Sequence, residues 1–192
     1  MRLGQNSQFS SFMANSRDIF AEPPCNFDYL VSLKYLNISN NGMDKLTGDQ
    51  FHLMVDVEYL DISSNKFTDF KPKLLQSNRN LKMIDMSRNQ FTTLPKATFK
   101  NQESLKIVKM DQNPWISLES SIFHHTPELD HVSIRHCPDL KGLPRNFFQQ
   151  NMNLEQVLLS GNERMDEELS KDFFTRDGVV DLIKVLHRRG FT

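Results

Sequence analysis

The chain contains only two cysteines in 192 residues, Cys25 and Cys137, and they lie far apart in the sequence. Small secreted domains that depend on disulfides carry a much denser set of cysteines. The composition therefore excludes a fold held together by a disulfide framework. On its own it favours either a reducing compartment or a piece of a longer protein.

An excess of charge of one sign is also missing. The chain has 23 basic and 24 acidic residues, which gives a formal net charge of −1. Nucleic-acid binding needs a basic patch or stripe, and the cluster His187-Arg188-Arg189 is too small to provide one. We therefore expect no nucleic-acid partner.

Long hydrophobic runs are absent as well. No run of about 18 apolar residues is present, so we expect no membrane span in this chain. The opening segment MRLGQNSQFSSF lacks the apolar region of a signal peptide. We expect either a cytosolic protein or an internal piece of a longer one, folded as a single domain.

Sequence motifs of common enzymes do not occur. The chain contains no G-x-S-x-G, no phosphate-binding loop, no H-E-x-x-H and no C-x-x-C. The sequence therefore favours a chain that is not an enzyme and that has no cofactor.

What the sequence does contain is a repeat of the form L-x-x-L-x-L-x-x-N, seen clearly in Leu81, Ile84, Met86 and Asn89. Further apolar residues follow each first position at offsets of 10, 13 and 18 residues. The first positions are spaced by 24 residues, and by 25 at the last step: Leu33, Val57, Leu81, Leu105, Leu129 and Leu154.

Alternation of apolar and polar residues within x-L-x-L-x predicts a short strand with one buried face. Identical strands stacked side by side form a parallel sheet, and the chain must then turn out of that sheet. A buried asparagine can donate to and accept from the backbone groups that this turn leaves unpaired. We predict a buried structural ladder of six such positions: Asn41, Asn65, Asn89, Asn113, Cys137 and Asn162.

This pattern resembles the leucine-rich repeat family, whose consensus allows cysteine at the asparagine position. The resemblance covers about residues 30 to 175. The 24-residue units, with Leu94-Pro95 before Phe99 and Leu143-Pro144 before Phe147, resemble those of Toll-type receptor ectodomains. The resemblance to leucine-rich repeats implies an α/β repeat fold. We expect a curved solenoid with a parallel concave sheet and an irregular convex side.

We expect one domain over residues 1–192. Residues 1–32 form a degenerate first repeat and N-terminal cap, 33–162 six repeats, and 163–192 a C-terminal cap. Solenoid ends need such caps because each unit buries its apolar face only against its neighbours. A capping helix is predicted because four apolar residues fall on one helical face: Val179, Leu182, Ile183 and Leu186. A helix that binds a partner is the alternative.

Side chains on the concave face of the sheet are expected to face solvent and to be free for a partner. The first column combines aromatic and apolar residues, and the next two columns are polar and charged, a mixture that interfaces favour. The candidate partner-binding residues are Tyr35, Tyr59, Met83, Ile107 and His131, then Asn37, Asp61, Asp85 and Lys109, then Asp111 and Arg135.

Two chemical alternatives arise from the same positions. His124, His125, His131 and His136 cluster near Cys137, but the strand register sends them to different sides, whereas zinc needs converging ligands. We therefore expect no metal. Asp61 and Asp85 lie side by side on adjacent strands and could form an acid–base pair. Because no nucleophile accompanies them, a solvated or ligand-facing acidic patch is the stronger interpretation.

The leading interpretation is a non-enzymatic module that binds a protein partner or ligand on its concave face. The resemblance to Toll-type ectodomains implies extracellular or cell-surface recognition in innate immunity, and the sequon Asn37-Ile38-Ser39 fits secretion. The alternatives are a cytosolic scaffold or adaptor that regulates a signalling protein, and the substrate-recognition part of a larger enzyme such as a ubiquitin ligase. The sequence leaves the ligand and the oligomeric state open.

Overall fold

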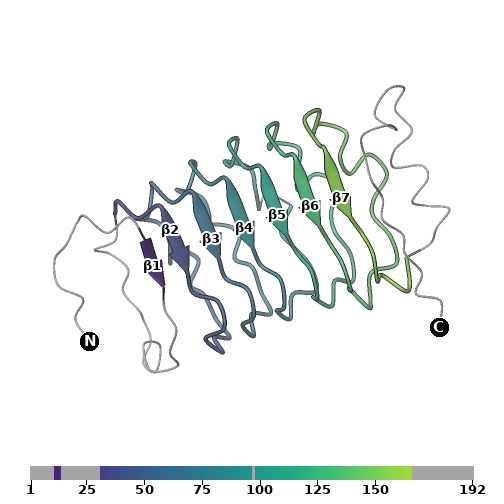
Figure 1. Ribbon diagram of the computed structural model, residues 1–192, viewed down its shortest axis with the longest axis horizontal. Helices are drawn as coiled ribbons and strands as arrows, with labels where there is room; N and C mark the ends of the chain where they lie inside the picture. Colours follow the sequence, from purple (N-terminus) through teal and green to yellow (C-terminus); the bar gives the residue numbers. More distant parts are fainter. Residues whose placement is uncertain (1–10, 14–30, 97, 166–192) are drawn as a thin grey trace.

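The computed structural model describes residues 11–13, 31–96 and 98–165 (Figure 1). Within this part, three-residue strands alternate with long connections made of turns, and no residue is helical. The strands are β1 Ser11–Met13, β2 Tyr35–Asn37, β3 Tyr59–Asp61, β4 Met83–Asp85, β5 Ile107–Lys109, β6 His131–Ser133 and β7 Gln156–Leu158.

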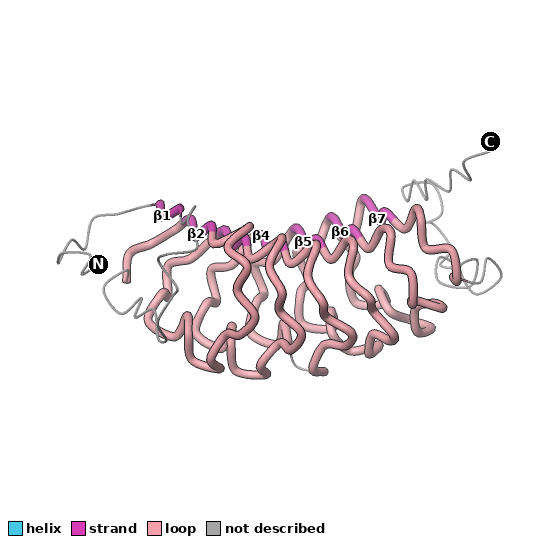
Figure 2. The backbone as a smooth tube through the Cα atoms, turned by 90° about the horizontal axis from the view of Figure 1, so that it is seen from below, coloured by secondary structure: helices cyan, strands magenta, loops and turns pink. Residues whose placement is uncertain are grey.

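The strands form one parallel sheet in sequence order, β1 to β7. Equivalent repeat positions pair directly, so that Tyr35 lies beside Tyr59 and Tyr59 beside Met83. From β2 to β7 the middle residue of each strand is buried. Figure 2 shows the strands on the inner side of a curved body, with the connections opposite. One face of the sheet is therefore open and the other covers the core.

The solenoid with a parallel sheet and an irregular convex side is the architecture observed. The α/β designation is wrong for the described part, which contains strands and turns only. The predicted capping helix lies in residues 166–192, outside the described residues. Of the expected degenerate first repeat, the structure describes Ser11–Met13, which pairs with β2.

The predicted asparagine ladder positions lie at the turn out of each strand and are buried. The Asn65 side chain accepts hydrogen bonds from the backbone N–H groups of Asn41 and Met43 at 3.1 and 3.0 Å. Its amide donates to the Ile38 carbonyl of the preceding unit and to the Ile62 carbonyl of its own, at 2.9 and 3.1 Å. One amide thus closes two turns at once.

A second ladder, which the sequence analysis missed, runs along the convex side. Asn78 donates to the carbonyls of Phe51 and Met54, and Asn151 to those of Phe123 and Thr126. Its members follow the first positions of four successive repeats by 21 residues, or by 22 in the unit that carries the extra residue, and that recurrence could have revealed them: Asn78, Gln102, Thr126 and Asn151. The same carbonyls also accept the backbone N–H three residues later, so each convex turn is closed within its own unit and bonded to the next unit.

Aromatic rings stack through the core between the sheet and the convex turns. Phe67, Phe91 and Trp115 form one column, with centroids 6.3 and 5.7 Å apart. Phe99 and Phe123 stack at 5.7 Å in another. Burial of each such ring contributes about 2–3 kcal/mol by transfer from water. Because these stacked rings come from successive units and belong to one buried cluster, the core is continuous along the solenoid.

The residue before each ladder position adopts a left-handed backbone, with φ between 54° and 73°. These residues make the bend that takes the chain out of the sheet: Asn40, Ser64, Arg88, Gln112, His136 and Gly161. Gly161 is required for a second reason, since a Cβ there would lie 2.1 Å from Nδ1 of His136.

We predict that Asn89→Ala lowers the free energy of unfolding by about 3 kcal/mol, because it leaves several buried backbone groups without partners. The Asn89 side chain accepts from the Phe67 N–H and donates to the carbonyls of Ile62 and Met86. Asn89→Cys should cost less, since the Cys137 thiol lies 3.3 Å from the Arg135 carbonyl at the matching position. Urea unfolding checks both, and equal losses would contradict the role given to the hydrogen bonds.

Candidate functional site: the concave face

The first concave column is built by the opening residues of six adjacent strands. Tyr35, Tyr59, Met83, Ile107 and His131 pair successively across β2 to β6, and Gln156 of β7 follows. All are partly or fully exposed, because the pleat turns the middle residue of each strand into the core. The structure therefore brings this predicted group together in one row.

Tyr35 and Tyr59 stack face to face, with ring centroids 4.5 Å apart and planes within 5°. Tyr35 is 48% exposed. Neither phenol hydroxyl forms a hydrogen bond to another residue in the part of the chain that the structure describes. The pair is a stacked aromatic surface whose polar ends are available for a partner.

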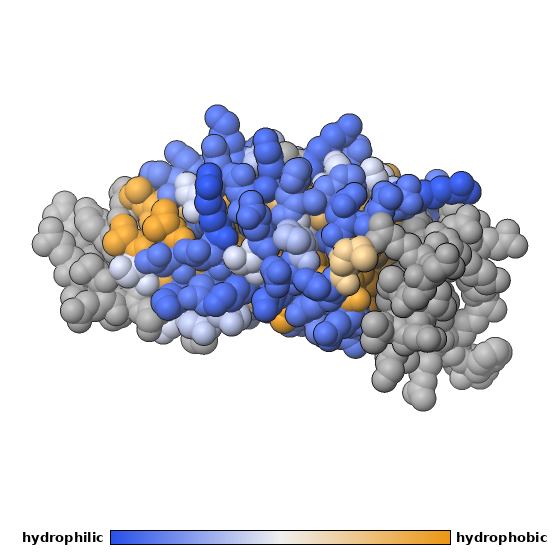
Figure 3. Space-filling model, turned by 90° about the horizontal axis from the view of Figure 1, so that it is seen from above, coloured by the Kyte–Doolittle hydropathy of each residue, from blue (hydrophilic) through white to orange (hydrophobic). Residues whose placement is uncertain are grey.

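Hydrophobic surface is sparse on the side of the described part that Figure 3 shows. In Figure 3, which views the molecule from above, hydrophilic residues cover most of the described surface. Hydrophobic surface gathers near the two ends of the solenoid, beside residues drawn in grey. Large exposed apolar side chains outside the first column include Ile116 and Met152.

The second concave column forms hydrogen bonds that stabilise the backbone, contrary to the expectation that concave side chains are free. Asn37, Asp61 and Asp85 each accept a hydrogen bond from the backbone N–H two residues later, at 2.9, 2.9 and 3.0 Å. Such local bonds satisfy an N–H where the strand ends. The sequence carries the corresponding signature in Asn-Ile-Ser, Asp-Ile-Ser and Asp-Met-Ser.

From β5 onward, side chains of the third column accept the hydrogen bond from this backbone N–H. Lys109 cannot accept a hydrogen bond, and the N–H of Asp111 donates instead to Oγ of Ser87, at 3.2 Å. The N–H of Arg135 then donates to Oδ1 of Asp111 at 2.8 Å. The third column is thus part of the scaffold in this half of the sheet.

Asp111 corrects the expectation of a partner-facing carboxylate. It is buried, and its carboxylate accepts from Oγ of Ser133 at 2.6 Å and from Nε and Nη2 of Arg135 at 3.0 and 2.7 Å. Both guanidinium N–H groups converge on Oδ2, and charge-assisted hydrogen bonds of this kind are among the stronger polar contacts in proteins. Asp111 therefore has no acceptor left for a ligand, whereas the Arg135 side chain remains 42% exposed.

A row of charges borders the first column on its other side. Glu58 accepts a hydrogen bond from Lys82 at 2.7 Å and pairs with Lys34 at 3.3 Å. The hydrogen bond from Lys82, followed by that from Lys34, lowers the pKa of the Glu58 carboxyl. These positions were not among the predicted residues, although alternating charges at 24-residue spacing were visible in the sequence.

A polar hollow of about 270 Å³, named here the concave hollow, lies where strands β3 to β6 end. Charged side chains of both signs line it: Asp85, Arg88, Lys109, Asp111 and Arg135. Lys109 approaches Asp85 at 3.7 Å, a loose contact compared with the Arg135–Asp111 pair. The hollow adjoins the first column, because Met83 and Ile107 lie two residues before Asp85 and Lys109.

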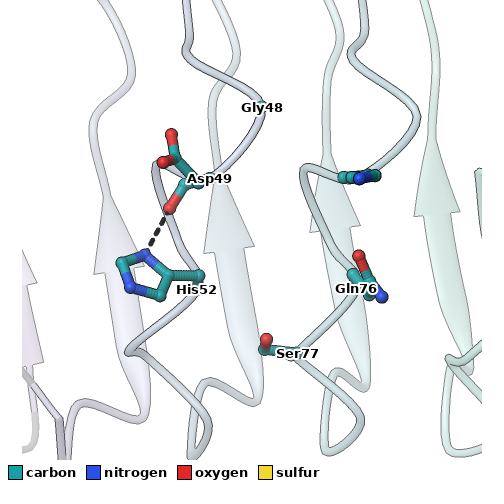
Figure 4. Close-up of a pocket in the computed structure, with 6 residues that line it drawn as sticks. Gly48, Asp49, His52, Gln76 and Ser77 are labelled. Atoms are coloured by element: carbon teal, nitrogen blue, oxygen red, sulfur yellow. Dashed lines mark hydrogen bonds between the residues drawn. The ribbon is translucent and has the colours of Figure 1, made fainter.

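A second hollow, of about 380 Å³, lies between the connections that follow β2 and β3 (Figure 4). His52 points toward Asp49, whose carbonyl oxygen lies 2.7 Å from its Nδ1. Gln76 and Ser77 come from the next unit along the chain. Hydrogen bonds at these residues involve backbone carbonyls of the turns, so the hollow is attributed to the scaffold.

The histidine side chains near Cys137 and the Cys137 thiol lie in separate surroundings. In the described part of the chain, no group of three or more His, Cys, Asp or Glu residues is placed to hold a metal ion. His131 contacts Asp130 at 2.6 Å, and burial raises the pKa of the free Cys137 thiol to about 11. The described segments also contain no helix able to cross a membrane. Cys25 lies outside the described residues.

Comparison with known proteins agrees with this architecture. A family model described as leucine rich repeat matches residues 56–115. A second, described as a BspA type leucine rich repeat region of six copies, matches residues 88–174. These matches confirm that the chain carries leucine-rich repeats, which are typically protein-interaction modules. No curated protein matches the chain.

Two aspartates that look alike in the sequence should respond differently to the same change. We predict that Asp111→Asn lowers the free energy of unfolding by about 2 kcal/mol, because it removes the charge that Arg135 neutralises. Asp61→Asn should change it by less than about 0.5 kcal/mol, since Asn37 performs the same hydrogen bonding in β2. Thermal and urea unfolding measure the difference, and similar losses would argue against the assigned roles.

Proposed function

We propose that this chain is a non-enzymatic protein-binding module that recognises its partner through the concave face. The observation that carries the proposal is the row formed by Tyr35, Tyr59, Met83 and Ile107. These side chains are exposed or half-buried, and none of them forms a side-chain hydrogen bond to the described residues. The stacked tyrosines are pre-ordered, so binding would cost little side-chain entropy.

The physical chemistry of the row supports protein binding over other roles. Aromatic side chains in ordered surroundings dominate binding energy at protein interfaces, and charged residues commonly form the margin. Here the Lys34–Glu58–Lys82 charges lie along one side of the row and the concave hollow along the other. No nucleophile–base arrangement accompanies these residues in the described part of the chain.

We further propose that the partner is met outside the cell or at its surface, in a receptor-like role in innate immunity. The support is the resemblance of the units to those of Toll-type receptors and the sequon at Asn37 on the open face of β2. The alternative is a cytosolic scaffold that regulates a signalling protein. The free, buried Cys137 and the low cysteine content favour that alternative.

The first test removes the aromatic row without disturbing the scaffold. In affinity capture from cells that express the chain, Tyr35→Ser/Tyr59→Ser should reduce recovery of specific partners about tenfold or more. Ile116→Ser is the matched control, because Ile116 is 61% exposed and lies outside the sheet. Equal recovery with both variants, each folded by thermal unfolding, would overturn the concave-face proposal.

The compartment is tested with the natural gene product, tagged at its C-terminus and fractionated. The receptor-like role predicts protein in the medium or at the cell surface, with a mobility shift on glycosidase treatment. Asn37→Asp should abolish that shift and leave the fold intact, since aspartate provides the same hydrogen bond in β3 and β4. Unglycosylated protein in the cytosol would instead support the scaffold alternative.

A further inference from the structure

The concave hollow has more cationic groups than its own carboxylates neutralise. Among the side chains that line it, Arg88, Lys109 and Arg135 face two carboxylates, Asp85 and Asp111, which leaves a formal surplus of one positive charge. The next carboxylate, Asp61, lies beside Asp85 outside this lining, and one of its oxygens accepts from the N–H of Ser63. Asp111 is fully occupied by Ser133 and Arg135. The surplus therefore lies on the Arg88 and Lys109 side of the hollow.

The side chains of Arg88 and Lys109 both have N–H groups that no described residue accepts within hydrogen-bond distance. The Nζ atom of Lys109 lies 3.7 Å from Asp85, beyond ordinary hydrogen-bond distance, and its side chain is 45% exposed. One oxygen of Asp85 is already committed to the N–H of Ser87. The exposed guanidinium of Arg88 makes no ion pair with any described residue. A ligand that brings one further acceptor group would satisfy these donors.

We propose that the concave hollow binds the carboxylate of an aspartate or glutamate in a partner protein segment. A single negative charge matches the surplus of one, whereas a phosphate group would bring −1.5 to −2. Charge-assisted hydrogen bonds from lysine and arginine to a carboxylate are roughly twice as strong as neutral ones. This inference rests on the proposed function of the concave face and names the chemistry of its partner.

The neighbouring column defines the rest of the partner motif. Ile107 lies two residues before Lys109 on the same face of β5, and the two Cα atoms are therefore about 7 Å apart. An extended segment places residues i and i+2 at about that spacing, and a helix places i and i+3 or i+4 at about 5–6 Å. The partner segment therefore carries an acidic residue two to four positions from an aromatic or aliphatic one.

The test uses a phage-displayed library of random 12-residue peptides, selected on the full chain. Enriched peptides are expected to combine Asp or Glu with an apolar residue at a separation of two to four positions. A synthetic peptide of the selected consensus, measured by fluorescence anisotropy, should bind Arg88→Ala and Lys109→Ala about tenfold more weakly than the original chain. Replacing the peptide's acidic residue by its amide should have a similar effect.

Control variants separate this inference from the proposed function. Lys100→Ala removes an exposed positive charge beside the buried Phe99 on the convex side, and binding should not change. One outcome would overturn the carboxylate site alone. In it, the enriched peptides carry no acidic residue, and their binding is weakened by substitution of Tyr35 and Tyr59 but not by substitution of Arg88 or Lys109. The absence of enriched peptides, or binding insensitive to every concave variant, would overturn both proposals.

Discussion

The hydrogen bond from a side-chain amide to the backbone of a neighbouring unit is the interaction on which the rest of this structure depends. Every turn out of the sheet leaves N–H and C=O groups that cannot pair within their own unit. Asn65 and Asn113 close these turns by accepting from the preceding unit and donating to carbonyls of both units. No unit is complete alone, so each is stable only as part of the stack.

This dependence also decides what each concave position can be used for. Ladder side chains fix the ends of strands β2 to β7, with Cys137 in place of asparagine after β6. The N–H two residues after the second concave position then needs an acceptor of its own. Asn37, Asp61 and Asp85 supply it locally, and Ser87 and Asp111 supply it from the preceding unit. The first column has no such task. Its side chains are therefore the ones that can vary with the partner without loss of stability.

The sequence predicted the repeat, its strands and the buried asparagine positions because each depends on residue type at a fixed spacing. The sequence could not predict the role of Asp111, which lies in the same column as Ser87 and Arg135. That role depends on hydrogen bonds to Ser133 and Arg135 of the next unit. The convex ladder that begins at Asn78 recurs every 24 or 25 residues, but polar side chains there resemble ordinary surface residues until their carbonyl partners are known. The chemistry of a partner leaves no comparable periodic trace.

The arrangement of charge across the concave face follows from the same geometry. Asp61 and Asp85 each bond the end of their own strand, so the second column is acidic there. Where Lys109 replaces them, Ser87 accepts from the N–H of Asp111, and in the next unit Asp111 accepts from the N–H and the side chain of Arg135. Two neighbouring ion pairs result, one tight and one loose. The tight pair belongs to the scaffold, because its carboxylate holds a backbone N–H. The loose pair holds no backbone group through Lys109, so its lysine can exchange Asp85 for another carboxylate while the strand end stays in place.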